Sequence, residues 1–293
     1  MPSVLKFAVG IMLLVLVPLA CGQSNPKEVQ LTFTTIDVPG AMMTGILGIN
    51  SSGEMVGWYT QTGATSTGFL FSDGTFTFFN YPGADSTQPY GINDSGLISG
   101  TAYSQQNTIA VGFSYDQVNF RTIRAPGKSA TLPHGINNSG NIVGGYGFLI
   151  EPQGFELVAG RFHTVSPPGN NSVVFVNGIN NLGELVGTVT AGTGNNGFAF
   201  KSGRFQAIRF PGANNTTAWG VNDTGIIVGS HQTVAGFDGF ALMGGRYISF
   251  GYPGAVITAA FGINSAGQIV GSYSLDEQTF HGFVTSPITV ADF

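Results

Sequence analysis

One short motif occurs six times in this chain, and its repetition constrains the fold more than any other feature. The motif reads Gly-Ile-Asn-x-x-Gly, with Val in place of Ile in the fifth copy. The copies begin at Gly48, Gly91, Gly135, Gly178, Gly220 and Gly262, so that successive starts lie 43, 44, 43, 42 and 42 residues apart. A constant period of this length is typical of an array of like structural units. We therefore expect one repeated architecture over nearly all of the sequence after residue 30.

Each repeat also contains four short segments rich in β-branched and aromatic residues, which turn residues separate. In the fifth copy these segments span residues 216–222, 226–231, 239–242 and 246–250. The Asn-x-x-Gly sequence between the first two predicts a type I turn, because the Asn side chain caps the turn and Gly adopts a positive φ without steric cost. A Pro-Gly pair follows the fourth segment and ends it, since proline cannot donate to a β-ladder. We therefore predict four antiparallel strands in each repeat.

The whole pattern predicts an all-β fold, a six-bladed β-propeller over residues 31–293. No segment has helical periodicity, and four strands in about 42 residues are typical of a propeller blade. A linear β-solenoid and a pair of β-sandwiches are the alternatives, but solenoid repeats are usually shorter and sandwiches do not repeat so evenly. Residues 31–38 have the features of a fourth strand. We expect them to close the ring in the last blade, with residues 288–293 alongside.

The order of the strands predicts which residues lie at the axis. In a propeller the chain enters each blade at its innermost strand, and here the Pro-Gly connection leads into the strand that ends in Gly-Ile-Asn. The residue before this Gly differs from copy to copy: it is Leu47, Tyr90, His134, Asn177, Trp219 and Phe261. Six such side chains would form a ring rich in aromatic groups, which suit sugar rings or apolar ligands. Packing between blades is the simpler interpretation of the same six residues.

The two faces of the predicted propeller differ in variability. The Pro-Gly crossings share one face with the loops between second and third strands, and these loops vary in sequence at 60–67, 104–110, 189–196 and 232–238. The opposite face carries the uniform Asn-x-x-Gly turns. Variable loops on a uniform scaffold are typical of recognition surfaces, so the crossing face is the predicted binding face.

The repeats resemble the HAF-repeat family of extracellular proteins. That family is marked by Gly-Ile-Asn-x-x-Gly-x-Ile-Val-Gly, as in the copy that ends at Ile142-Val143-Gly144, and by a small residue before Phe in a later strand. The resemblance covers residues 31 to 286. The chain departs from the His-Ala-Phe triplet, because only His281-Gly282-Phe283 keeps the His and Gly replaces Ala in all six copies. The resemblance implies export and a propeller-like fold, and it implies no established reaction.

The N-terminal sequence predicts export. Lys6 precedes the apolar run 7–20, which is too short to span a bilayer. Two alternatives stay open for processing: Cys21, the only cysteine, becomes the acylated first residue of a lipoprotein, or an ordinary signal peptide is cleaved after Gly22. Residues 1–22 are the predicted signal peptide and residues 23–30 a short tether. The protein is predicted to be secreted or held at the cell envelope, with a lipid on Cys21 as its expected membrane contact.

Composition excludes several classes of function. Charged residues make up only 9% of the chain and hydrophobic residues 42%, which is too apolar for a disordered protein. A net charge of −5 with ten Lys and Arg leaves no basic stripe for a nucleic acid. His134, His163, His231 and His281 occupy different positions of the repeat and do not form a metal-ligand spacing. No metal, cofactor or catalytic residue is therefore predicted.

These observations favour an exported, non-catalytic propeller that binds an extracellular carbohydrate or protein. The alternative is an extracellular polysaccharide hydrolase or lyase on the same scaffold. Such an enzyme needs converging carboxylates, or a His such as His134 beside a carboxylate, at one end of the axis. Asp94 and Asp223 lie instead in Asn-x-x-Gly turns, where Asp is a common turn former. A third interpretation is a purely structural surface protein.

Overall fold

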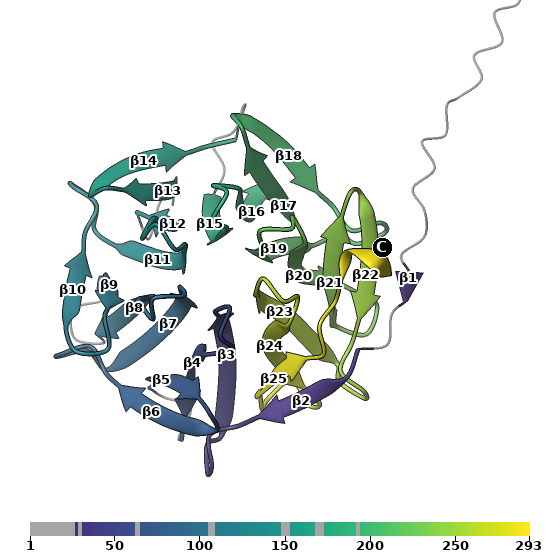
Figure 1. The fold of residues 1–293 in the computed structure, drawn as a ribbon, viewed down its shortest axis with the longest axis horizontal. Helices are drawn as coiled ribbons and strands as arrows, with labels where there is room; N and C mark the ends of the chain where they lie inside the picture. Colours follow the sequence, from purple (N-terminus) through teal and green to yellow (C-terminus); the bar gives the residue numbers. More distant parts are fainter. Residues whose placement is uncertain are drawn as a thin grey trace, which may run out of the picture.

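The computed structural model describes residues 27–28, 31–61, 65–104, 109–147, 153–167, 173–191 and 194–293. The predicted signal peptide and Cys21 lie outside these ranges. The described chain is strands and turns, with a single 3-10 helix, η1 (Val290–Asp292). Figure 1 shows the sheets arranged radially around a central axis. The prediction of an all-β, propeller-like fold is confirmed.

The innermost strand of each repeat is the one that carries Gly-Ile-Asn, as the sequence predicts. These strands surround the axis in Figure 1 and line the central cavity described below. In chain order they are β3 (Met43–Ile49), β7 (Ser86–Ile92), β11 (Thr131–Ile136), β15 (Val173–Ile179), β19 (Thr216–Val221) and β23 (Ile257–Ile263).

The second and third strands of each repeat follow outward in antiparallel order. The second strands are β4 (Met55–Thr60), β8 (Ile98–Ser104), β12 (Ile142–Tyr146), β16 (Leu185–Ala191), β20 (Ile227–Gln232) and β24 (Ile269–Ser274). The third strands are β5 (Thr67–Ser72), β9 (Ile109–Tyr115), β13 (Gln153–Val158), β17 (Gly194–Lys201), β21 (Phe237–Met243) and β25 (His281–Thr285).

The outer strand comes from the same repeat in five cases and from the N-terminal segment in the sixth. The five are β6 (Thr75–Phe79), β10 (Phe120–Ile123), β14 (Arg161–Val165), β18 (Arg204–Ile208) and β22 (Arg246–Phe250). In the sixth repeat, β2 (Phe33–Ile36) pairs antiparallel with β25, in agreement with the position predicted for residues 31–38.

The strands form five hydrogen-bonded sheets, four of them with four strands. The fifth has nine strands, because it unites repeats 5 and 6 through one bridge between Phe237 and Ile257. It also includes β1 (Lys27–Glu28), which lies parallel to β22. Part of the segment predicted to be a tether is therefore a short strand at the edge of repeat 5.

The Asn-x-x-Gly turns have the predicted geometry. In the first repeat the Gly53 N–H donates to the Asn50 carbonyl at 3.1 Å, and Gly53 has a φ of +86°. The Asn50 Oδ1 atom accepts the Glu54 N–H at 2.9 Å. Glycine takes this left-handed conformation without the steric cost that a side chain adds.

The crossings between repeats are fixed by a threonine on the inner strand, a feature that the sequence analysis did not identify. The Phe210 N–H, after the outer strand of repeat 4, donates to the Thr216 hydroxyl at 3.0 Å. The equivalent bond joins Val38 to Thr44 at 3.1 Å. Crossings also bond to second strands, as in the Gln232 N–H that donates to the Asn215 carbonyl at 3.0 Å. The crossings and the ends of the second strands therefore share one face.

Aromatic residues of the third strands form the core of the sheets. Their Phe side chains are buried almost completely: Phe69, Phe113, Phe155, Phe198, Phe240 and Phe283. The Gly before each Phe leaves room for the neighbouring repeat. A side chain at Gly112 would meet the Pro133 ring of repeat 3 at 2.6 Å.

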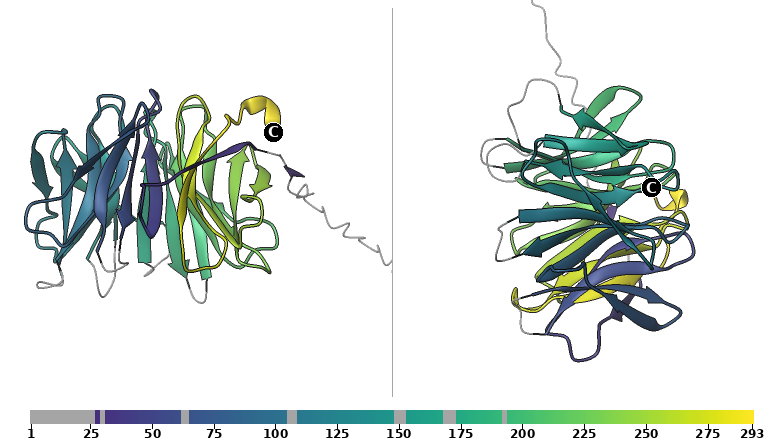
Figure 2. Two further views of the ribbon diagram at one scale, coloured as in Figure 1. Left: turned by 90° about the horizontal axis from the view of Figure 1, so that it is seen from below. Right: turned by 90° about the vertical axis from the view of Figure 1, so that its left-hand side faces the viewer.

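The C-terminal tail lies against the last repeats and forms no strand. Ile288 is buried and its N–H donates to the Gly267 carbonyl at 2.9 Å, while an Arg246 guanidinium N–H donates to the Phe293 carbonyl at 2.5 Å. Figure 2 shows η1 raised above one face of the molecule. None of the described segments is a helix of the length and hydrophobicity that a membrane span requires.

Candidate functional site

Every inner strand is interrupted by a β-bulge at the residue that precedes Gly-Ile-Asn. In the first repeat Ile46 pairs with Gly57 and Gly48 with Val56, so Leu47 has no partner in the ladder. The register shifts at the same residue in four other repeats, and in the third it shifts over His134 and Gly135 together. A bulge releases a residue from the ladder and re-aims its side chain. The variable residue of each repeat is therefore the one that the bulge turns away from the sheet.

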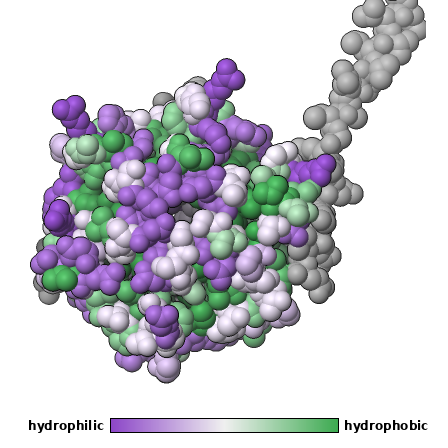
Figure 3. Space-filling model, viewed as in Figure 1, coloured by the Kyte–Doolittle hydropathy of each residue, from purple (hydrophilic) through white to green (hydrophobic). Residues whose placement is uncertain are grey.

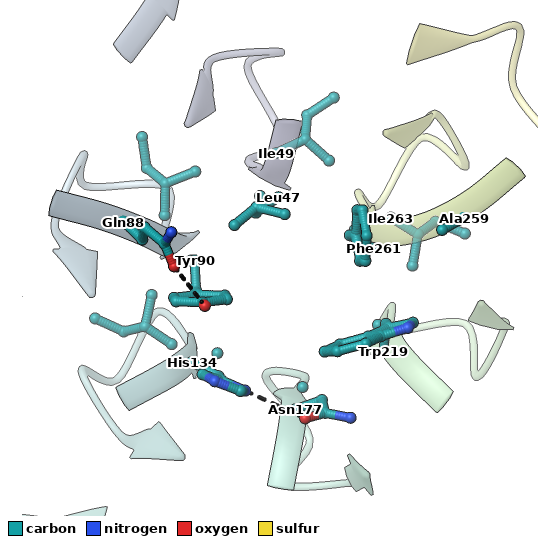
Figure 4. Close-up of a pocket in the computed structure, with 18 of the residues that line it drawn as sticks. Leu47, Ile49, Gln88, Tyr90, His134, Asn177, Trp219, Ala259, Phe261 and Ile263 are labelled. Carbon is teal, nitrogen blue, oxygen red and sulfur yellow. Dashed lines mark hydrogen bonds between the residues drawn. The ribbon is translucent and has the colours of Figure 1, made fainter. Parts of the chain in front are cut away.

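The six bulge residues meet at the axis, as the sequence predicts. They line a cavity of about 510 Å³, which is within the size range of small-molecule sites. Figure 4 shows them arranged around its centre: Leu47, Tyr90, His134, Asn177, Trp219 and Phe261. Leu47 and Asn177 are buried, and the other four are only partly buried. These four side chains therefore pack against their neighbours and keep part of their surface exposed.

The cavity wall has an apolar arc and a polar arc. Repeats 5, 6 and 1 contribute Trp219, Phe261 and Leu47, and the Trp219 and Phe261 rings meet edge to face with centroids 5.2 Å apart. Repeats 2, 3 and 4 contribute Tyr90, His134 and Asn177. The cavity is therefore two-sided, although the scaffold around it repeats.

The polar arc is a network of hydrogen bonds and ring stacking. The Tyr90 hydroxyl donates to the Gln88 Oε1 atom at 3.0 Å, and the Tyr90 ring stacks on His134 with centroids 4.3 Å apart. The His134 Nδ1 atom lies 3.2 Å from Asn177 Oδ1. The Asn177 amide nitrogen donates to the Ala218 carbonyl at 2.8 Å and to the Thr188 hydroxyl at 3.0 Å.

This network fixes the tautomer of His134. A backbone carbonyl only accepts, so the contact with Ala218 orients the Asn177 amide with its oxygen toward His134. His134 Nδ1 therefore carries a proton and donates it. Burial lowers the pKa of His134 to about 4, against the opposing effect of the bond to Asn177. The ring is neutral at ordinary pH, and Nε2 is an acceptor.

Beyond the cavity the axis becomes polar on the face of the Asn-x-x-Gly turns. Six aliphatic residues of the motif line both spaces: Ile49, Ile92, Ile136, Ile179, Val221 and Ile263. Past them the amide of each motif Asn donates to the carbonyl of the next motif Asn, up to Asn264, which donates to Asn50 at 3.1 Å. Figure 3 shows hydrophilic residues gathered around the centre of this face.

The two turn aspartates belong to this polar end and hold neighbouring turns together. Asp223 accepts the Asn181 N–H at 2.8 Å, and Asp94 accepts the Ser51 N–H at 2.8 Å. Partial burial alone would raise the pKa of Asp94, but hydrogen bonds from Ser51 and Asn138 outweigh it and keep the pKa below its usual value. Their role as turn residues agrees with the sequence analysis.

The four histidines lie in different environments. His163 is exposed on an outer strand, and His231 stacks on Phe210 inside repeat 5 with centroids 3.5 Å apart. His281 pairs with Asp37 across the junction of β25 and β2, with Nδ1 2.7 Å from the carboxylate. Within the described part of the chain, no three His, Cys, Asp or Glu side chains are grouped as metal ligands.

Several cavity residues escaped the sequence analysis. Further residues that line the cavity are Gln88, Trp58, Met43, Phe280, Ala259 and Ser272. The alternation of a strand was a usable signal for Gln88, since it lies two residues before Tyr90 and so faces the same side. Trp58 and Phe280 belong to other strands and loops, and no local pattern places them at the axis.

No family model and no curated protein matches this chain. Solved structures do resemble its fold at very low sequence identity. Virginiamycin B lyase from Staphylococcus aureus has a TM-score of 0.51 at 14% identity, over 89% of this chain and 90% of the lyase.

Two further structures extend this comparison. The β-propeller domain of the Trilobed protease from Pyrococcus furiosus has a TM-score of 0.52 at 7% identity, over 84% of this chain and 94% of that domain. SapL1 lectin, solved with α-methyl fucoside, has a TM-score of 0.54 at 10% identity, over 85% of this chain and 97% of the lectin. At such identities the likeness shows the fold alone, a β-propeller scaffold.

Proposed function

We propose that this protein is an exported, non-catalytic β-propeller of six blades that binds a ligand in its axial cavity. The observation that carries the proposal is the bulge, which presents the variable residue of every repeat to one shared cavity. Bulges are over-represented next to functional sites. A residue that only filled a gap would need no release from the ladder.

Two sets of contacts support a closed ring of six blades. The strand β2 completes the sheet of the last repeat by pairing with β25. The chain of asparagine hydrogen bonds also returns from Asn264 to Asn50, so that the last repeat bonds to the first as the others bond to their neighbours. A ring of this kind leaves only the edges of short outer strands, and β1 pairs with one of them, β22.

The partner of His134 favours binding over catalysis. A His that acts as an acid or base in polysaccharide cleavage would face a carboxylate, whereas His134 faces the amide of Asn177. Among the described residues that line the cavity, none is an Asp or a Glu. These features support a ligand-binding role rather than the hydrolase or lyase alternative.

The remaining parts of the proposal come from the sequence. The N-terminal apolar run supports secretion or attachment to the cell envelope, with a lipid on Cys21 as one alternative. The six copies of the motif support membership of the HAF-repeat family. An extracellular carbohydrate or protein then remains the proposed class of partner.

Replacement of Trp219 or Tyr90 by Ala tests the proposal. We expect each variant to lose at least about tenfold in affinity for the best compound of a glycan and metabolite screen. The melting temperature should fall by less than about 4 °C, because both side chains are partly exposed. Titration calorimetry and thermal unfolding measure the two effects.

Two phenylalanines provide matched controls. Phe240→Ala removes a completely buried ring and should lower the melting temperature by about 10 °C. Phe78→Ala removes a half-exposed ring from an outer strand and should change neither binding nor melting temperature much. If the Trp219 and Tyr90 variants melt like the Phe240 variant, the six residues are core and the proposal is wrong.

A further inference from the structure

The axial cavity has a ring-nitrogen acceptor to which no described residue donates, and its position suggests what the cavity binds. His134 uses Nδ1 to donate to Asn177. Tyr90 stacks on the ring from repeat 2, and Phe175 lies nearly parallel to it from repeat 4, with centroids 6.1 Å apart. Because these two rings lie beside the faces of the imidazole, the edge that carries Nε2 is the part of His134 that a ligand can reach. No described residue donates to that atom.

The polar groups next to His134 are already engaged. Both protons of the Asn177 amide and its oxygen have partners, and the Tyr90 hydroxyl proton goes to Gln88. A buried polar group of a ligand that finds no partner loses affinity, since desolvation is not repaid. A sugar, with several hydroxyls around its ring, would find few acceptors here, because the indole N–H groups of Trp58 and Trp219 can only donate. A ligand with one donor fits this wall better.

The opposite arc is apolar except for the indole N–H of Trp219, which can only donate. Trp219, Phe261 and Leu47 face the polar arc across the cavity (Figure 4). Aromatic faces and edges favour planar, apolar rings. No charged side chain is found among the described lining residues, so a charged ligand would lose its hydration without a counter-ion.

We propose that the cavity binds an uncharged, planar aromatic molecule with one hydrogen-bond donor, whose ring lies against Trp219 and Phe261 and whose donor bonds to Nε2 of His134. This inference rests on the proposed axial binding function, and for the axial cavity it replaces the carbohydrate or protein of that proposal with a small aromatic ligand. The ligand thus resembles a phenol or an N–H heterocycle rather than a sugar or an organic acid.

A pair of probes that differ in one proton tests the donor. We would measure the binding of 2-naphthol and of 2-methoxynaphthalene to the full-length protein by equilibrium dialysis at neutral pH. The two share the fused ring, but the methyl ether has no donor. We expect 2-naphthol to bind about three- to tenfold more tightly, the range that one neutral hydrogen bond supplies.

Variants locate the effect at His134. His134→Phe keeps an aromatic ring but removes Nε2, so the two probes should bind it equally. His163→Phe makes the same change on an exposed outer strand and should keep the wild-type preference. The comparison of probes on the wild-type protein stays decisive even if the His134 variant folds poorly.

The outcomes separate this inference from the proposed function. Equal binding of both naphthalenes to the wild-type protein would overturn the donor role and leave axial binding intact. Binding of 2-naphthoate or methyl glucoside in their place would overturn the ligand class. If none of the four probes binds, and the Trp219 and Tyr90 variants leave the affinity for the best screened compound unchanged, the axial site itself is wrong.

Discussion

The motif asparagine has two separate tasks in each repeat. In repeat 3 the Asn137 Oδ1 atom accepts the N–H groups of Ser139 at 3.1 Å and Asn141 at 3.0 Å, which closes the turn. Its amide nitrogen donates to the Asn180 carbonyl of the next repeat at 3.3 Å. Asp serves the first task equally well but has no donor for the second. This difference accounts for Asn in all six copies.

At the same scale, His134 predicts how stability depends on pH. Its folded pKa of about 4 lies below the ordinary value of 6.5, so the unfolded chain binds the proton more readily. The contribution of the neutral His134 ring to the free energy of unfolding is complete above the pKa of the unfolded state. It is lost as the pH falls toward the pKa of the folded state. We expect this residue alone to remove on the order of 2 kcal/mol of unfolding free energy between about pH 7 and about pH 4.5.

Urea unfolding of the wild-type protein and of His134→Phe measures this contribution as a difference. The variant should lose less stability over that pH range than the wild type does. His163→Phe should follow the wild type, because His163 is exposed. Identical losses in the wild type and the His134 variant would contradict the neutral, buried state of this ring.

At the scale of strands, the motif encodes a bulged hairpin. The last Gly of Gly-Ile-Asn-x-x-Gly-x-Ile-Val-Gly lies on the second strand beside the bulge, as Gly187 does opposite Val176. A side chain at Gly187 would overlap the Phe175 carbonyl oxygen and press on the Phe198 ring. Glycine there allows the first strand to come close where it bulges.

Gly187→Ala should therefore destabilise the protein by about 2–4 kcal/mol, since backbone and core must both shift. Gly203→Asn is the matched control in the same repeat: its turn is open, and Asn tolerates the positive φ of +77°. The control should stay within about 0.5 kcal/mol of the wild type. Urea midpoints compare the two, and a Gly187 variant as stable as the control would show that the bulge does not need this glycine.

Local sequence patterns predicted the positions of the strands well, and they predicted part of the axial cavity. The strands of repeat 5 lie within two residues of their predicted starts and ends, because turn residues bound each of them. The ring of bulge residues followed from their variation between fixed neighbours. The bulge itself did not, since it depends on the register between two strands. The Asn177 network also depends on Thr188 and Ala218, which no sequence period relates to it.

At the scale of the whole molecule, the two ends of the chain meet in repeat 6. The Asp37 carboxylate lies 2.7 Å from His281 Nδ1 and also accepts the Gly282 N–H at 3.1 Å. Thr35 on β2 contacts the hydroxyls of Tyr252 and Tyr273, both at 3.1 Å. These contacts join residues more than 200 positions apart, so local sequence patterns could not predict them. They hold β2 against β25 in the last repeat.

The axial position of the ligand is the central claim, and it distinguishes this account from binding between blades or on the outer surface. A crystal structure of the protein soaked with the tightest compound of the screen tests it most directly. We predict one ligand molecule per chain, enclosed by six blades, with its ring against Trp219 and its polar group at His134. An empty cavity, with the compound seated between repeats or on an outer strand, would contradict the account.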